Sequence, residues 1–364
     1  MAASWADLPP ELLELCSRQL LLEDWFAFRS VCSTWRAAAF KERFDFPWLM
    51  LADEDKSAES RWAEFRCLFT LRIHRVLLPE AKSCLSSRGW ILTIGKDSEM
   101  HMLNPLSRAA TRYRDDIIVL PSVNKISGSD YDEGSDYDEL VVKFILSASP
   151  ASSPNYTVMV IYWPSGPLCY WKPGNEEWKL LTLPDPLDPV LENVLDVIHY
   201  QGQFIGVNSF GSILRFDPDG PDPIEVLLER PQEFRDLIKF CVDLYLVESA
   251  GRLLLVSHFR LLEDSKDYTT GFKVFAVDLD TRQWTELESI GNACLFVGFN
   301  SSFSVHVDEN QHSIKPNCIY FTGCCDMGTY YMEDGRIEFD KKADYNPHPP
   351  LWIDSPPLWI EPSF

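Results

Sequence analysis

The chain of 364 residues is poor in basic side chains, with 33 lysines and arginines against 55 aspartates and glutamates, and its formal charge is −22. Unassisted nucleic-acid binding and attachment to an anionic membrane both need a basic surface, so these functions are disfavoured. No apolar run approaches the roughly 18 residues that span a bilayer. The N-terminal region lacks the basic start and apolar stretch of a secretory signal. We therefore expect a protein of the cytosol or nucleus, with reduced cysteines.

Motifs of catalysis and metal binding are also missing. There is no G-x-S-x-G elbow, no P-loop and no H-E-x-x-H sequence. Cys318, Cys324 and Cys325, with His306 and His312, lack the paired spacing of a zinc site, and buried structural cysteines explain them better. The histidines are scattered and are expected to be structural: His74, His101, His199, His258, His306, His312 and His348. We expect no catalytic residue, no metal and no cofactor.

Aromatic residues are plentiful and favour strands over a helix bundle, with 12 Trp, 13 Tyr and 22 Phe. From about Phe65 onward, short apolar runs alternate with Gly, Pro, Asn and Asp. Residues 156–163 and 252–256 are examples. Runs of this length, rich in β-branched and aromatic residues, indicate an all-β sandwich, barrel or propeller.

A weak internal repeat favours the propeller. Residues 170–178 read as strand, turn and tryptophan, and residues 275–284 repeat that order. Glycine hairpins are predicted separately, at residues 87–89, 200–203, 249–252 and 333–336. A blade takes about 40–50 residues, so the region after Phe65 has room for about six or seven. One large β-sandwich with irregular hairpins is the alternative.

The first residues predict a short helix with one apolar face. Pro9 and Pro10 suit the first helical turn, and Glu11 places negative charge near the positive end of the helix dipole. Apolar residues recur at helical spacing along one face: Leu12, Leu13, Cys16 and Leu20.

Two further short helices are predicted, capped by Asp24 and by Ser33. Three short helices within about 40 residues bury little surface by themselves, so such a unit needs a partner. It is either a cap on the rest of the chain or a module that docks onto another protein.

The order of motifs in this stretch resembles the F-box: Leu8-Pro9-x-Glu11-Leu12-Leu13, then Asp24-Trp25-Phe26, then Val31-Cys32-x-x-Trp35-Arg36. Cys16 stands where that family usually has isoleucine. The resemblance implies binding to the Skp-type adaptor of a cullin ubiquitin ligase. The residues it implies for that contact are Leu8, Pro9, Leu12, Leu13, Cys16 and Leu20, completed by Val31, Cys32 and Trp35.

Later motifs extend the likeness to nearly the whole chain. The Asn104-Pro105-Leu106-Ser107 corner, Cys324-x-Asp326-Met327-Gly328 and the terminal Trp359-Ile360-Glu361-Pro362-Ser363 are similar to a large plant family. In that family an F-box precedes a kelch-like β-propeller. The resemblance implies a non-catalytic receptor that brings a target protein to the ligase, without indicating the target. The alternatives are a propeller scaffold with a decayed F-box and a propeller hydrolase.

The predicted organisation is mainly β, with a three-helix F-box at residues 4–45 before a propeller at residues 65–345. Between them, residues 46–64 read as a charged linker. The acidic stretch at 127–139 contains a near-duplicated sequence and is expected to be a mobile insert, because it is poor in aliphatic residues. The tail at 346–364 is rich in Pro and Trp, and we expect it to pack along the propeller or the helical module.

Overall fold

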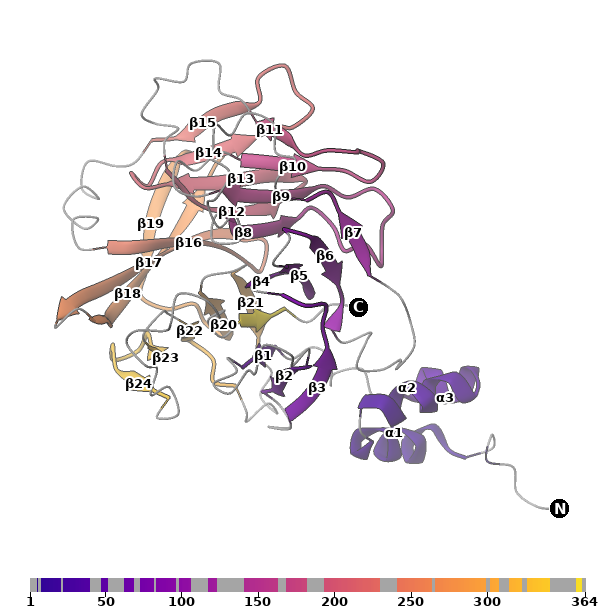
Figure 1. The fold of residues 1–364 in the computed structure, drawn as a ribbon. Helices are drawn as coiled ribbons and strands as arrows, with labels where there is room; N and C mark the ends of the chain where they lie inside the picture. Colours follow the sequence, from indigo (N-terminus) through magenta and orange to yellow (C-terminus); the bar gives the residue numbers. More distant parts are fainter. Residues whose placement is uncertain are drawn as a thin grey trace.

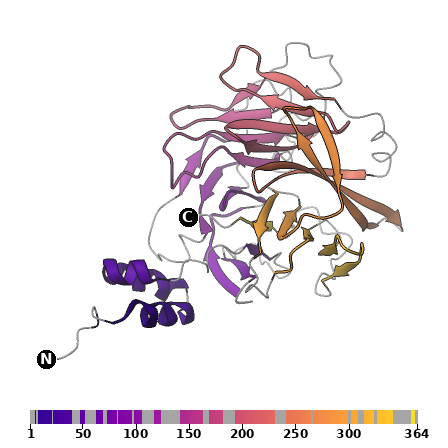
Figure 2. The same cartoon turned by 180° about the vertical axis from the view of Figure 1, so that it is seen from behind.

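A computed structural model of the chain describes Trp5 and residues 8–20, 22–39, 47–51, 62–68, 73–81, 83–95, 98–105, 117–122, 141–162, 168–181, 193–229, 241–263, 266–298, 302–307, 314–322, 326–340 and 358–361. Within these residues, three helices precede a ring of six β-sheets (Figure 1). The helices lie to one side of the ring, next to the sheet that contains β1–β3, as the view from behind also shows (Figure 2).

The helices are α1 (Pro10–Gln19), α2 (Leu22–Val31) and α3 (Ser33–Ala38). Pro10 is the first residue of α1, as the sequence predicted, whereas Pro9, also expected in the first turn, is the N-cap. The two predicted side-chain caps were wrong. Because α2 begins at Leu22, Asp24 lies inside its first turn. Ser33 is already the first residue of α3, after Cys32 at the cap, and no side chain caps that end.

Each sheet is one propeller blade, whose hydrogen-bonded strands follow one another from the inner edge outward. Blade 1 contains β25 (Leu358–Ile360), β1 (Trp48–Met50), β2 (Trp62–Cys67) and β3 (Ile73–Leu77). Blade 2 contains β4 (Ser83–Ser87), β5 (Trp90–Ile94), β6 (Met100–Leu103) and β7 (Ile118–Leu120). Blade 3 contains β8 (Val141–Leu146), β9 (Val158–Tyr162), β10 (Leu168–Trp171) and β11 (Lys179–Leu181).

The remaining blades follow the same order. Blade 4 contains β12 (Val194–Tyr200), β13 (Gln203–Asn208), β14 (Ile213–Phe216) and β15 (Ile224–Leu228). Blade 5 contains β16 (Cys241–Ser249), β17 (Arg252–Glu263), β18 (Lys266–Asp278) and β19 (Gln283–Leu287). Blade 6 contains β21 (Phe303–His306), β20 (Ala293–Val297), β22 (Cys318–Thr322), β23 (Met327–Tyr331) and β24 (Ile337–Phe339), with β20 and β22 parallel.

The inner strands run around a common axis. β25 contacts β4, β4 contacts β8, β8 contacts β12, β12 contacts β16, and β16 contacts β21. Blade 6 then meets blade 1 in an apolar cluster that joins Leu49 to Phe296 and Phe303, which closes the ring. Six such clusters fill the six spaces between neighbouring blades, so the core is a set of layers between sheets.

This layering explains why the strands read as continuous apolar runs. Along β17, Leu253 and Leu255 pack toward blade 4, while Leu254 and Val256 pack toward blade 6. A strand that is buried on both faces has no polar face, so its sequence does not alternate.

The predicted turns are where the sequence placed them. Three two-residue hairpins join an inner strand to the next strand, and both turn residues have positive φ: Arg88-Gly89, Gln201-Gly202 and Ala250-Gly251. This is the backbone of a type I′ turn, which matches the twist of the paired strands. The two strand–turn–tryptophan repeats join β10 to β11 and β18 to β19, so they occupy the same place in blades 3 and 5.

The structure corrects the predicted boundaries. Strand β1, with all three residues buried, lies inside the expected linker at 46–64, so the propeller begins at Trp48. Strand β25 pairs with β1, with Ile360 opposite Trp48, so part of the tail is the inner strand of blade 1. The blade count is six. The charged stretch at 53–60 and the acidic insert at 127–139 lie outside the described residues.

Candidate functional site

The three helices share a small apolar interior. Leu13 of α1, Phe28 of α2 and Ala39 are buried there, and this interior is continuous with the core of blade 1 around Trp48. The aromatic rings interlock as well, since the centroids of Phe28 and Trp35 lie 4.4 Å apart. The Trp35 indole N–H donates to the backbone carbonyl of Trp5 at 3.2 Å. The module is therefore held together from within and anchored to the first blade.

Large apolar side chains remain exposed on the same module. Leu12 is 49% exposed, Leu15 60%, Val31 59% and Trp5 76%. On α1, Leu12, Leu15 and the exposed Cys16 are spaced by three and four residues, which places them on one helical face. We call Trp5, Leu12, Leu15, Cys16 and Val31 the helical apolar set. Several large exposed apolar side chains on so small a module are consistent with a protein–protein contact.

The nine residues predicted to contact an adaptor divide into three groups. Pro9, Leu12, Cys16 and Val31 are exposed, and Leu8, Leu20, Cys32 and Trp35 are partly buried. Leu8, Leu20 and Trp35 pack against the interior cluster. Leu13 departs from its predicted place on the surface, because at 1% exposure its side chain faces the interior. The surface offered to a partner is therefore made by its neighbours.

Sequence reasoning missed Leu15 and Trp5. Leu15 lies three residues after Leu12, so helical spacing was the signal that could have found it. Trp5 precedes the helix and is placed by the hydrogen bond from Trp35, which no local pattern indicates.

A second candidate site is a cavity of about 270 Å³ around the propeller axis. All six blades contribute to its lining, which is Ser87, Arg88, Ile145, Leu146, Val197, Ile198, His199, Glu248, Ala250, Ser302, Phe303, Ser304 and Glu361. The cavity opens on the face that carries the Arg88 and Ala250 hairpins. We call it the channel cavity.

Arg88 connects three blades at the rim of the channel cavity. Its guanidinium donates from Nε to the carbonyl of Leu146 at 2.9 Å and from a terminal nitrogen to the carbonyl of His199 at 3.0 Å. These two bonds connect the turn of blade 2 to the inner strands of blades 3 and 4. Burial, together with the Arg88 charge, lowers the pKa of His199, which keeps this imidazole neutral at neutral pH.

Two carboxylates reach the same cavity, Glu361 after β25 and Glu248 on β16. Burial raises the pKa of Glu361, while Arg88 opposes the shift through its charge and its backbone N–H, which donates to the carboxylate. Glu248 is exposed at the rim. The cavity therefore presents two acidic groups and one basic group, on walls that mix apolar side chains with serines and one histidine.

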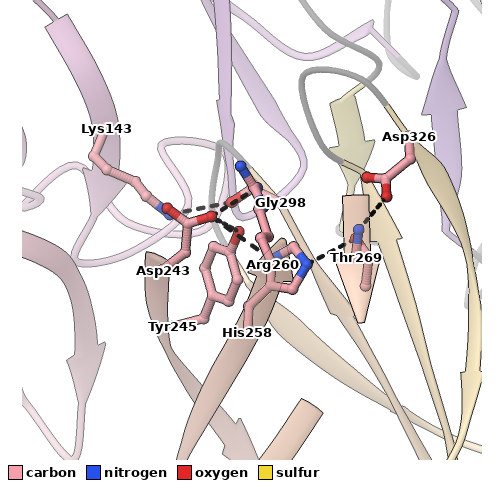
Figure 3. A network of polar contacts seen from close by, with 8 residues as sticks. All are labelled: Lys143, Asp243, Tyr245, His258, Arg260, Thr269, Gly298 and Asp326. Atoms are coloured by element: carbon pink, nitrogen blue, oxygen red, sulfur yellow. Dashed lines mark hydrogen bonds and ion pairs between the residues drawn. The ribbon is translucent and has the colours of Figure 1, made fainter. Parts of the chain in front are cut away.

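A largely buried network of charged and polar side chains extends from the inner strands β8, β12 and β16 to the neighbouring strands β17 and β18. Lys143 on β8 pairs with Asp196 on β12, and Asp243 on β16 pairs with Arg260 at 2.6 Å. His258 lies between Asp243 and Thr269 (Figure 3), since its Nδ1 is 3.6 Å from the Asp243 carboxylate and its Nε2 is 2.9 Å from the Thr269 hydroxyl. The Thr269 backbone N–H in turn donates to Asp326 at 2.7 Å.

Lys143, Asp196 and Asp243 lie at equivalent positions of the inner strands of blades 3, 4 and 5. The pairing of the inner strand with the next strand is interrupted just before Lys143, just before Asp196 and just before Asp243. A β-bulge redirects the side chain that follows it. The bulges thus explain how charged residues are accommodated in strands that are otherwise buried on both faces.

The described residues contain no group of three or more His, Cys, Asp or Glu side chains that could hold a metal ion. Cys318 is buried, with its thiol pKa raised by burial to about 11, and His306 is exposed on β21. Cys324, Cys325 and His312 lie outside the described part of the chain. Of the helices that the structure describes, none is long and apolar enough to cross a bilayer.

Comparison with known protein families finds a match for the propeller and another for the three helices. The family model described as the KIB1-4 beta-propeller matches residues 65–345, and that of the F-box domain matches residues 5–47. The chain belongs to the KIB1-4 β-propeller family. Its F-box domain coincides with the three helices, and its strands β1 and β25 complete the first blade on either side of the matched propeller region.

Relatives of this KIB1-4 family protein match it along nearly their whole length. F-box protein At4g35733 of Arabidopsis thaliana is 24% identical over 370 residues, covering 92% of this chain and 94% of that protein. F-box protein SKIP23 of the same plant is 23% identical, and the match covers 96% of each chain. Among solved structures, TolB from Acinetobacter baumannii is 12% identical with a TM-score of 0.44, covering 91% of this chain and 71% of TolB.

Proposed function

We propose that this protein is a substrate-recognition subunit of a Skp–cullin–F-box ubiquitin ligase, acting in the cytosol or nucleus. The F-box binds the Skp-type adaptor, and through it the cullin, while the propeller holds a target protein. The observation that carries the proposal is an F-box domain whose helices expose Leu12, Leu15 and Val31. An adaptor that covered these side chains would remove apolar surface from water, which is the main favourable term in association.

In this proposal the protein itself catalyses no reaction. Its contribution is proximity, because a target held on the propeller meets the ligase's catalytic partner at a raised effective concentration. The propeller is suited to that task, since it is a closed ring of six blades with a cavity at its axis.

Co-purification tests the assembly. The tagged full-length chain is expected to bring down both adaptor and cullin from plant cells, and a Leu8→Ala/Pro9→Ala variant is expected to lose both. Recovery of other partners without adaptor or cullin would favour the scaffold alternative, in which the F-box no longer functions.

One observation favours the hydrolase alternative, namely that Glu248 and Glu361 both reach the channel cavity. Pairs of carboxyl groups serve as acid and base, or as acid and nucleophile, in glycoside hydrolysis. Turnover of a panel of aryl glycosides and lactones by the wild type, lost in Glu361→Gln, would support this alternative. We expect no turnover above that of the variant.

A further inference from the structure

We propose that the channel cavity binds a lysine or arginine side chain of the target protein. This inference rests on the proposed receptor function and adds the chemistry by which the target is recognised. It is drawn from the charges at the cavity, from one polar group inside it, and from its size.

The charge at the channel cavity is unbalanced. Glu248 and Glu361 face one guanidinium, that of Arg88, whose Nε and one terminal nitrogen already donate to the carbonyls of Leu146 and His199. Burial keeps His199 neutral, so it adds no positive charge. Burial raises the pKa of Glu361, and a cation bound beside it would favour the ionised carboxylate, which gives the site a net charge of about −1 in the bound state.

Ser302 provides an independent sign that a ligand group belongs in this cavity. It lines the cavity and is only 8% exposed. Its hydroxyl oxygen is buried without a hydrogen-bond partner among the residues that the structure describes. Buried hydroxyls in folded proteins are nearly always hydrogen-bonded, because an unpaired one loses its hydrogen bonds to water and gains none in the protein. Since this oxygen is closed to solvent in the structure, the Ser302 side chain would turn toward the cavity to accept from an entering ammonium or guanidinium group.

The cavity's size and walls fit one long basic side chain. Cavities that enclose drug-sized ligands typically hold about 300–1,000 Å³, and this one measures about 270 Å³. The walls include Ile145, Val197 and Phe303, which can pack against an aliphatic stem while its charged end reaches the carboxylates. The chain's formal charge of −22 would attract a basic segment toward the protein before contact.

The test uses defined peptides and the purified full-length chain. Fluorescein-labelled Gly/Ser peptides with one central lysine, arginine, norleucine or acetyl-lysine are titrated at low salt and followed by anisotropy. We expect the lysine and arginine peptides to bind at least about tenfold more tightly than the other two, because each loses a charge-assisted hydrogen bond to the site when neutralised. Equal binding of all four, or no binding of the lysine peptide up to millimolar concentration, would overturn the inference.

Three variants locate the binding. Glu361→Gln is expected to abolish most of the discrimination between lysine and norleucine, and Glu248→Gln, at an exposed position where folding is not at risk, is expected to reduce it. Glu177→Gln makes the same charge change in the exposed turn between β10 and β11 and is expected to have no effect. Discrimination that survives in both cavity variants would place the binding elsewhere and contradict the proposal.

Adaptor binding, measured on the same preparations, separates this inference from the proposed function. Retained adaptor binding without peptide discrimination overturns the cavity site alone. Peptide discrimination without adaptor binding overturns the ligase assignment and leaves the cavity site in place.

Discussion

The ammonium of Lys143 lies 3.2 Å from the carboxylate of Asp196, with both side chains almost fully buried. The pair joins the inner strands of blades 3 and 4. Lys143 also reaches the Gly298 carbonyl of blade 6 at 3.4 Å and lies 5.3 Å from the ring centroid of Tyr245 in blade 5. This one side chain of blade 3 thus contacts three other blades, so it connects four of the six.

Removal of Lys143 should destabilise the whole propeller. Burial raises the pKa of Asp196, and Lys143 and the backbone N–H groups of Leu246 and Val197 oppose that shift. A Lys143→Met variant leaves this carboxylate buried without its counter-charge, which typically lowers the free energy of unfolding by about 3–5 kcal/mol. Urea unfolding measures the loss.

The matched control is Lys172→Met, which removes the same group from a more exposed pair with Asp219. Exposed pairs contribute at most about 1 kcal/mol, so this variant should unfold almost as the wild type does. Similar losses in the two variants would contradict the structural role given to Lys143.

His258 should make stability depend on pH. It is fully buried, stacks on Phe272 with ring centroids 4.4 Å apart, and burial lowers its pKa. The unfolded chain, with an ordinary histidine pKa of about 6.5, takes up the proton first, so His258 contributes a loss of stability as pH falls below that value.

Unfolding free energies at about pH 7.5 and about pH 5.5 test this sign. The fall in stability on acidification should be smaller in His258→Gln than in the wild type and in His306→Gln, which removes an exposed imidazole. Asp196 and Glu361, whose pKa values are raised by burial, contribute the opposite slope, so the comparison between variants isolates His258. An identical pH dependence in all three proteins would contradict the prediction.

The stability of the first blade should depend on Ile360 of the C-terminal strand. It is buried in β25 opposite Trp48 and belongs to the cluster between blades 1 and 2. Ile360→Ala should lower the free energy of unfolding by about 2–5 kcal/mol, as for other large core truncations. Val119→Ala, at an exposed position on β7, should change it by no more than about 0.5 kcal/mol. A silent Ile360→Ala would show that the C-terminal strand does not stabilise the first blade.

Leu13 and Leu15, two residues apart on α1, should behave in opposite ways. Leu13→Ala opens the buried interior of the helical module and should lower its stability by about 2–5 kcal/mol. Leu15→Ala truncates an exposed side chain and should leave stability unchanged to within about 0.5 kcal/mol. Hydrogen exchange of the α1 amides reports the difference. Faster exchange in Leu15→Ala than in Leu13→Ala would contradict the assignment of inner and outer faces.

Features that depend on neighbouring residues could be predicted from the sequence. The pairs Gln201-Gly202 and Ala250-Gly251 predict tight hairpins, because the backbone conformation of such a turn depends on its two central residues alone. The start of α1 is likewise predictable from neighbouring residues, Pro9 and Pro10. The six-bladed ring followed from the number and spacing of strands, to within one blade.

Features that depend on distant pairing could not be predicted. Nothing near Ile360 shows that it lies opposite Trp48, since the two are separated by almost the whole chain and the tail reads as a Pro/Trp segment. The channel cavity needs residues from all six blades, so Glu361 and Glu248 come together only in the folded ring. A usable signal was overlooked in the inner strands, where Lys143, Asp196 and Asp243 each place one charge near the start of an apolar run.

Titration of the purified Skp-type adaptor into the full-length chain tests the central claim most directly. The wild type should bind, and a Leu12→Asp variant should bind at least about 30-fold more weakly, as expected for a buried anchor residue. Val119→Asp, the same kind of change at an exposed position on the propeller, should bind as the wild type does. Absence of binding by the wild type, or equal binding by all three proteins, would contradict the account.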